Sequence, residues 1–310
     1  MAIILENSKI SLTIETAGEN YTGSRFDWNG TIVSAKFNGI ETLGEEKKLF
    51  HRNKKIFGRG MHNEFGIKRP IGYDEAGQDG LFPKIGTGWL KKNDVPYFFY
   101  TQYPVKPLDF DYALAGDDGD GENPTKAIFF CNSGSCNGYA YEYTKGITLL
   151  ENGFSTKYTL KNTGEKTLET DEYVHNFLRL GKSKTKKGQK LIFGWEIEEA
   201  KLIENINPSN TLKINKNEVV FLNTPKKNKE FFLGGLSGES VINGDSKIQG
   251  KWTLVDENLG ISMSETCDFN IEKADLWGHS EDISPELFYS FSIKPGETTS
   301  WTRTIEYAEL

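Results

Sequence analysis

The sequence predicts an all-β protein, built as an antiparallel sandwich or barrel. Many short segments alternate apolar and polar residues, which is the two-residue period of a half-buried strand. Turn signals rich in Gly, Asn, Asp and Pro separate these segments. No segment has the pattern of an amphipathic α-helix of three turns. These three observations together favour short strands joined by turns.

The N-terminal part of the chain contains one clear strand and two hairpin signals. Residues 9–15 alternate apolar and polar side chains, as expected for a half-buried strand. Residues 24–33 contain Asn29-Gly30 between two strand-like segments, which predicts a hairpin, and Asn38-Gly39 repeats this signal.

Residues 57–92 differ in kind, because glycines interrupt them and no long apolar run occurs. We expect a long irregular crossing, and loops of this length are usually functional, although a plain surface excursion is the alternative. The polar and aromatic residues of this segment include Arg59, His62, Glu64, Lys84 and Trp89. A strand is expected next, over residues 97–105.

Two charged segments are interpreted as loops. Residues 116–123 are rich in Asp and Gly, but their spacing does not match a calcium-binding EF-hand loop, so an ordinary turn is favoured. Residues 182–190 form the strongest basic cluster, between glycines, and indicate a solvated loop, with a phosphate or polyanion contact as the alternative.

The second half of the chain is a succession of strand patterns. The turn Lys294-Pro295-Gly296-Glu297 joins the last two strands. The expected strands cover residues 146–150, 154–161, 168–177, 191–197, 211–222, 231–236, 251–255, 261–265 and 287–293.

Composition limits the function classes. A chain of 310 residues is long enough for two domains, but we expect one domain over residues 1–310, since large β-sandwiches often use this length. The formal net charge of −7 argues against a nucleic-acid binder. The N-terminus has no signal-peptide pattern and no run is long enough for a membrane helix, so a cytoplasmic protein without a membrane partner is expected. Oligomeric state is left open.

Three cysteines, Cys131, Cys136 and Cys267, have no zinc-type spacing, which favours reduced structural thiols. A bridge between Cys131 and Cys136 stays open at this point. Aromatic residues make up 13% of the chain, and amphipathic rings suit surfaces on which sugar rings stack.

The expected strand over residues 168–177 contains one of the four histidines. Tyr173, His175 and Phe177 share one face if this segment is extended. An imidazole between two aromatic rings fits a surface that faces a sugar, or it fills a polar gap in a sheet.

Several pieces of the chain, in their order, resemble the galactose mutarotase-like superfamily, and most closely the aldose 1-epimerase-related proteins. The resemblance covers nearly the whole chain and implies a β-supersandwich whose concave face binds a hexose. The pieces are Ser24-Arg25-Phe26-Asp27-Trp28-Asn29-Gly30, Asn63-Glu64-Phe65-Gly66, Phe82-Pro83-Lys84-Ile85-Gly86-Thr87-Gly88, Val174-His175-Asn176-Phe177, Ser284-Pro285-Glu286-Leu287-Phe288 and Lys294-Pro295-Gly296-Glu297.

The resemblance implies a catalytic pair. His175 matches the histidine that acts as general acid at the ring oxygen, and Glu286 best matches the glutamate that takes the proton of the anomeric hydroxyl. Opening a hemiacetal needs both proton transfers, and reclosure after rotation gives the other anomer. The resemblance implies no metal and no organic cofactor.

Other expected site residues depart from the family pattern. Lys84 stands where a further histidine is expected, and His62 lies too early in the chain for that position. Arg59 approximates the sugar-binding arginine, and Asp245 and Asp275 are candidates for a binding aspartate. Further expected substrate contacts come from Glu64, which with Lys84 could equally form a structural ion pair, from Tyr173, and from the stacking candidates Trp277 and Trp89.

Three functions are weighed. The leading hypothesis is an aldose 1-epimerase-like isomerase acting on a hexose or hexose phosphate. The alternative is a carbohydrate-binding protein of the same fold without catalysis, favoured by the missing histidine. A polysaccharide lyase or hydrolase is disfavoured, because no pair of facing carboxylates at glycosidase spacing is evident.

Overall fold

The structure is a computed structural model that describes residues 2–46, 53–116, 123–181, 186–227, 229–238 and 247–310. Residues 117–122 of the expected acidic turn, residues 182–185 of the basic cluster, and Asp245 lie outside the described residues.

The first sheet has ten strands, all paired antiparallel. Its strands are β1 (Ile3–Glu6), β2 (Ile10–Glu15), β3 (Thr31–Phe37), β4 (Ile40–Glu41), β5 (Met61–Phe65), β13 (Leu168–Asn176), β15 (Glu204–Ile206), β18 (Phe231–Gly234), β21 (Lys273–Gly278) and β22 (Ile283–Ile293). Their order across the sheet is β1-β2-β3-β5-β13-β22-β21-β18-β15, and β4 pairs with β3.

The second sheet also has ten antiparallel strands. They are β9 (Asp109–Ala115), β10 (Lys126–Asn132), β11 (Tyr141–Leu150), β12 (Gly153–Asn162), β14 (Gln189–Phe193), β16 (Leu212–Asn215), β17 (Glu218–Phe221), β19 (Gln249–Asp256), β20 (Ile261–Asn270) and β23 (Thr298–Glu309). Their order is β16-β17-β14-β19-β20-β23-β12-β11-β10-β9.

A small third sheet and two short 3-10 helices complete the elements. The sheet contains β6 (Leu81–Lys84), β7 (Gly88–Lys91) and β8 (Val105–Pro107). The helices are η2 (Glu199–Lys201) and η3 (Pro208–Asn210). The described residues contain no α-helix, and no helix among them is long and apolar enough to cross a membrane.

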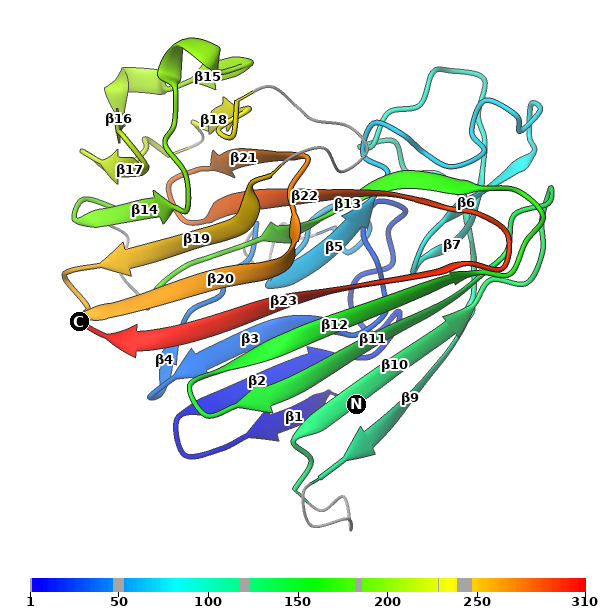
Figure 1. The fold of residues 1–310 in the computed structure, drawn as a ribbon, viewed down its shortest axis with the longest axis horizontal. Coiled ribbons are helices and arrows are strands. Elements are labelled where there is room, and N and C mark those ends of the chain that lie inside the picture. The colour runs from blue at the N-terminus through cyan, green and yellow to red at the C-terminus, as the bar shows by residue number, and fades with distance from the viewer. Residues whose placement is uncertain (1, 47–52, 117–122, 182–185, 228, 239–246) are drawn as a thin grey trace.

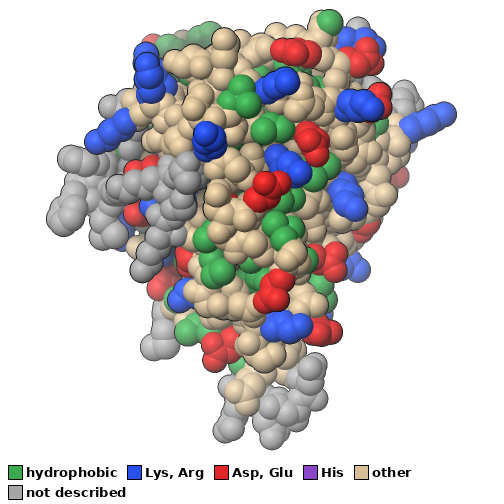
Figure 2. All heavy atoms as spheres, turned by 90° about the vertical axis from the view of Figure 1, so that its left-hand side faces the viewer, with side chains coloured by type: hydrophobic (Ala, Val, Ile, Leu, Met, Phe, Trp, Pro, Cys, Tyr) green, Lys and Arg blue, Asp and Glu red, His purple; other side chains and the backbone are tan. Residues whose placement is uncertain are grey.

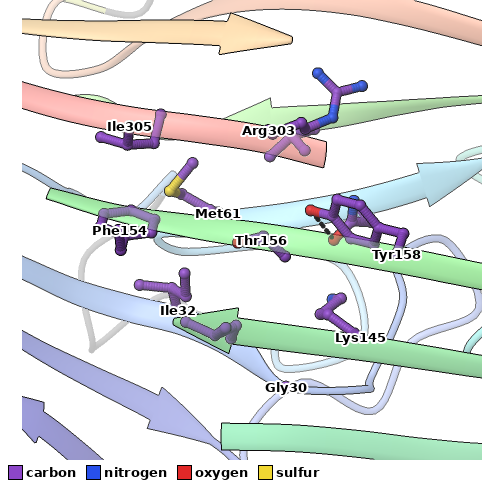
Figure 3. Close-up of a pocket in the computed structure, with 12 residues that line it drawn as sticks. Gly30, Ile32, Met61, Lys145, Phe154, Thr156, Tyr158, Arg303 and Ile305 are labelled. Carbon is purple, nitrogen blue, oxygen red and sulfur yellow. Dashed lines mark hydrogen bonds between the residues drawn. The ribbon is translucent and has the colours of Figure 1, made fainter. Parts of the chain in front are cut away.

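The two large sheets lie face to face and enclose the core (Figure 1). Arg303 of β23 joins them, because its guanidinium contacts Glu172 of β13 (2.7 Å) and Glu265 of β20 (2.7 Å). A cavity of about 20 Å³ lies between the sheets, with apolar side chains such as Phe154 and Ile305 toward one end and the polar Tyr158, Lys145 and Arg303 toward the other (Figure 3). This volume suits about one water molecule.

The prediction of an all-β antiparallel sandwich is confirmed. The hairpin at Asn38-Gly39 is also confirmed, since both residues have positive φ (47° and 78°) between β3 and β4. Positive φ at both positions is what a tight hairpin turn requires.

The hairpin predicted over residues 24–33 is wrong, because only β3 forms there. The Asp27 N–H donates to the Asn63 carbonyl (2.9 Å) and the Trp28 N–H donates to the Gly86 carbonyl (2.9 Å). The backbone of this segment therefore bonds to other elements instead of pairing with β3.

Two further predictions are corrected. Residues 57–92 are not wholly irregular, because β5, β6 and β7 lie within them. Residues 97–104 do not form a strand. Tyr97 and Tyr103 stack on each other (5.7 Å) over Phe82, and this aromatic packing folds the segment into turns.

The described residues contain no disulfide bond. Cys131, Cys136 and Cys267 are free thiols, so the question of a bridge between the first two is answered. On the face shown in Figure 2, acidic and basic side chains are interspersed and do not gather into one patch of either sign. The single domain, the cytoplasmic location and the absence of a nucleic-acid partner stay predictions.

Candidate functional site

His175 and Glu286 lie side by side on the first sheet, in the neighbouring strands β13 and β22. The His175 Nε2 is 3.7 Å from the Glu286 Oε1, and each residue is 5% exposed. Alternate residues of β13 face opposite ways. Val174 lines the cavity between the sheets, so His175 projects from the other face of the sheet.

Aromatic side chains surround the imidazole. The ring of Phe177 stacks on His175 with centroids 4.4 Å apart, and Trp277 of β21 meets it edge-on at 5.1 Å. This packing fixes the ring and leaves the buried Nδ1 without a hydrogen-bond partner among the described residues.

Glu286 is held by its own strand. The Ser284 hydroxyl donates to the Glu286 Oε1 (3.1 Å) and accepts from the Asn176 N–H (2.9 Å). Ser284 thus links the carboxyl group to the end of β13, beside His175. Asp275 of β21 is the register partner of Glu286, and it contacts the Lys273 ammonium.

Burial shifts the two pKa values in opposite directions. Burial raises the pKa of Glu286 to about 8, and the nearby charge of Asp275 adds to this rise. Burial lowers the pKa of His175 well below 6.5, and Arg25, His62 and His279 add to this fall. Both groups are neutral at pH 7, with the proton on Glu286 and an unprotonated imidazole.

Glu64 of β5 organises a second group next to the pair. Its Oε2 accepts from the Arg25 Nε (2.7 Å) and from the Tyr173 hydroxyl (2.6 Å). The Lys84 Nζ lies 4.0 Å from the Glu64 Oε1 and donates to the Phe65 carbonyl (2.5 Å). Glu64 therefore offsets part of the positive charge of the buried Arg25 and Lys84, which stabilises these cations in the interior.

Lys84 occupies an unusual environment for a lysine. Burial lowers its pKa to about 8, and the charge of Glu64 limits that fall. The Lys84 ammonium is nevertheless anchored by protein groups, since the Tyr97 hydroxyl accepts a further hydrogen bond at 3.3 Å.

His62 belongs to the same face. It is the register partner of His175 across β5 and β13, and its ring stacks on Phe26 with centroids 4.8 Å apart. The sequence places His62 too early for the family's further histidine, yet the sheet brings it beside His175.

The structure brings together seven of the nine expected site residues, namely His175, Glu286, His62, Glu64, Lys84, Tyr173 and Trp277. It does not bring Arg59 or Trp89 to them. Arg59 pairs with Glu15 at the end of β2, and the Trp89 indole donates to the Ser133 carbonyl (2.9 Å) within the core.

Arg25 is the residue that the sequence analysis missed. It lies at the centre of the cluster, with its guanidinium 4.5 Å from the Phe26 ring, and the rings of Phe99 and Tyr100 cover it at 4.7 and 4.9 Å. Its place beside Phe26, in a piece of the chain that carries the resemblance, was the available signal.

The described residues contain no group of three or more His, Cys, Asp or Glu side chains that could hold a metal ion. The arrangement offers a proton donor and a proton acceptor 3.7 Å apart, the Trp277 ring beside them, and Arg25 and Lys84 gathered around Glu64. General acid/base chemistry on a small polar molecule is what such a site can do.

No protein-family model matches the chain, and no curated protein sequence matches it. Solved structures do match. A galactose mutarotase-like protein from Lactobacillus casei is 14% identical with a TM-score of 0.57, covering 99% of this chain and 100% of that chain. A galactose mutarotase-like protein from Clostridium acetobutylicum is 12% identical with a TM-score of 0.56, covering 100% and 95%.

A homologue of GalM/aldose epimerase from C. elegans is 11% identical with a TM-score of 0.58, and the match covers 100% of this chain and 99% of that chain. These comparisons establish that the chain has the galactose mutarotase-like fold over its full length. At such low identities they establish the fold and not the activity.

Proposed function

We propose that this protein interconverts the α and β anomers of a hexose by general acid/base catalysis, with His175 and Glu286 as the catalytic pair. The observation that carries the proposal is the geometry of this pair, 3.7 Å apart on adjacent strands, together with the opposite shifts of the two pKa values. The anomeric oxygen and the ring oxygen share one carbon atom, so two groups this close can serve both oxygens.

The reaction needs one group of the pair to carry a proton and the other to accept one. Ring opening takes a proton from the anomeric hydroxyl and gives a proton to the ring oxygen, and reclosure reverses both transfers. The family resemblance assigns the acid role to His175, whereas burial in the free protein favours the proton on Glu286. Both assignments place one proton on the pair, and they differ only in which group carries it before the substrate binds.

The remaining cluster supports binding and orientation. Trp277 offers a ring edge beside His175, and Tyr173 and Arg25 are fixed by Glu64. Arg25 and Lys84 are both engaged by Glu64, which favours a neutral hexose over a hexose phosphate. Because His175 and Glu286 are almost fully buried, substrate binding requires the side chains that cover them to move.

A non-catalytic carbohydrate-binding protein is the second candidate. Lys84, at the position where the resemblance expects a histidine, supports it, because an ammonium held by the Phe65 carbonyl and Glu64 is a poor proton shuttle.

Exchange NMR on the α and β anomers of free hexoses and hexose 6-phosphates separates the two candidates. Catalysis predicts exchange faster than in buffer for at least one sugar, and loss of this acceleration in the His175→Asn/Glu286→Gln double variant. The control Glu151→Gln alters an exposed carboxylate and should keep the rate. Sugar line broadening without faster exchange supports the binding protein instead.

A further inference from the structure

A groove of about 460 Å³ is lined by residues of β9 and its neighbours. Figure 1 shows β9 at the edge of the second sheet. Phe110 and Tyr112 of β9 form one side with Phe129 of β10, and Thr16 and Asn29 approach from the segments that flank β2 and β3. None of these residues belongs to the His175–Glu286 cluster. The volume is in the range of small-molecule sites, ~300–1,000 Å³.

Asn29 gives the groove an unsatisfied polar group. This residue is 1% exposed, and neither its Oδ1 nor its Nδ2 has a hydrogen-bond partner among the described residues. Its backbone N–H donates to the Asp27 Oδ1 (2.6 Å), which holds the residue in place. Buried amides are almost always paired, so an unpaired donor and acceptor side by side indicate a missing ligand.

Aromatic rings supply the apolar part of the groove. Phe110 stacks on Trp28 with centroids 6.2 Å apart, and Tyr112 packs 6.1 Å from Phe129 while staying 46% exposed. Such rings accept the C–H face of a pyranose. As an edge strand, β9 also leaves backbone N–H and C=O groups free to bond a polar ligand.

The charge of the groove limits the ligand further. The described residues that line it include no lysine or arginine, and Asp111, the register partner of Phe130, points away from the face that carries Tyr112. An anionic ligand such as a sugar phosphate would find no cationic side chain there. A neutral polyhydroxyl ring, which pairs with an amide through adjacent hydroxyl groups, fits the set of contacts.

We propose that this groove is a second carbohydrate site that binds a neutral pyranose on Tyr112 and Phe110, with the Asn29 amide bonding two of its hydroxyl groups. The inference does not depend on the catalysis proposed for His175 and Glu286.

Titration with methyl β-D-glucopyranoside and methyl β-D-galactopyranoside, followed by saturation-transfer NMR, tests the site. Methyl glycosides have no anomeric hydroxyl, so they cannot be interconverted. Tyr112→Ala should weaken binding of at least one probe by about tenfold or more. The control Phe130→Ala removes a comparably exposed ring (40%) from the other face of β10 and should leave binding unchanged.

Asn29→Leu separates a ligand-binding role from a structural one. It should abolish probe binding without lowering Tm, because it removes an unpaired buried amide. Anomer exchange should be unchanged in Tyr112→Ala, so failure of this proposal is distinct from failure of the catalytic one. Absence of probe binding, binding lost only in Trp277→Ala, or tighter Tyr112-dependent binding of glucose 6-phosphate would overturn the proposal.

Discussion

His175 and Glu286 lie on neighbouring strands of the first sheet, and both side chains are buried. Burial disfavours the charged form of each. Since they lie 3.7 Å apart, both can contact one substrate molecule. Over the range between their pKa values the pair holds one proton. This is the residue-scale basis of the proposed chemistry.

The rate of anomer exchange should therefore depend on pH as a bell. At low pH the His175 imidazole becomes protonated, with a midpoint well below 6.5, and both groups then carry a titratable proton. Above about pH 8 Glu286 loses its proton, and neither group then carries one. The measurement is kcat/KM by exchange NMR from pH 4 to 10. A rate that rises steadily with pH would contradict the one-proton pair.

The basic limb needs a control, because burial also lowers the pKa of Lys84 to about 8. In Lys84→Met the fall above pH 8 should persist. Its disappearance would assign that limb to the lysine.

Glu286→Gln should stabilise the protein at alkaline pH. The pKa of Glu286 rises from 4.5 in the unfolded chain to about 8 in the folded one, so the free energy of unfolding falls as pH increases through this window. The neutral amide removes this dependence, which is worth up to roughly 4–5 kcal/mol above pH 8.

Urea denaturation at pH 4.5, 7 and 9 measures the difference between Glu286→Gln and wild type. The gain should grow with pH, whereas the exposed control Glu151→Gln should give a flat difference. A constant difference for Glu286→Gln would show that the carboxyl group is not protonated in the folded protein.

At the scale of elements, glycines with positive φ shape the hairpins and the approach of the two sheets. Gly39 (φ 78°) lies in the turn between β3 and β4, and a Cβ there would meet open space. Gly30 (φ 67°) precedes β3, and its Cβ would lie 2.5 Å from the Phe129 ring of β10. The same substitution therefore has different costs at these positions.

Gly39→Ala should destabilise the protein by roughly 1–2 kcal/mol, the backbone cost of positive φ. Gly30→Ala should add about 1–3 kcal/mol of overpacking to this cost. Midpoints of urea unfolding with similar m-values test the order. Equal losses would mean that Phe129 moves aside freely.

Local sequence signals predicted some elements and missed others for a physical reason. Asn38-Gly39 and the alternation of residues 9–15 are local, and both predictions are confirmed. β5 escaped prediction because its buried residues His62, Asn63 and Glu64 are polar on both faces. The residues that pair with these polar side chains come from distant segments, so no local sequence pattern predicts the strand.

The same reason explains which residues of the candidate site could be predicted from the sequence and which could not. The matching motifs identified His175 and Glu286, which the sheet brings into contact. Arg25 was missed because Glu64 and Tyr173, its partners, lie 39 and 148 residues away. Arg59 and Trp89 were expected in the site, but Glu15 and the Ser133 carbonyl hold them elsewhere.

At the scale of the whole molecule, the two sheets are joined by a buried ionic network as well as by apolar packing. Arg303 contacts Glu172 and Glu265, and it donates to the Leu287 carbonyl (2.9 Å). The Asn63 amide donates to the same Glu172 (2.5 Å). Because Glu172 and Glu265 belong to different sheets, this network fixes their relative position.

Arg303→Met should destabilise the protein by about 3–5 kcal/mol, because it leaves two buried carboxylates without their cation. The control Lys9→Met breaks an exposed pair with Glu151 and should cost at most about 1 kcal/mol. Chemical denaturation measures both. A small loss in Arg303→Met would mean that the carboxylates take up protons and the sheets pack well without the network.

The central claim is that His175 and Glu286 act as one catalytic unit within this fold. The most direct test is the rate constant of anomer exchange for the preferred hexose in wild type, His175→Asn, Glu286→Gln and the double variant. Each single variant should lose about 10²–10⁴-fold, and the double variant should lose no more, because residues that act together are not additive. Wild-type exchange no faster than buffer, or single variants that keep the wild-type rate, would contradict the claim.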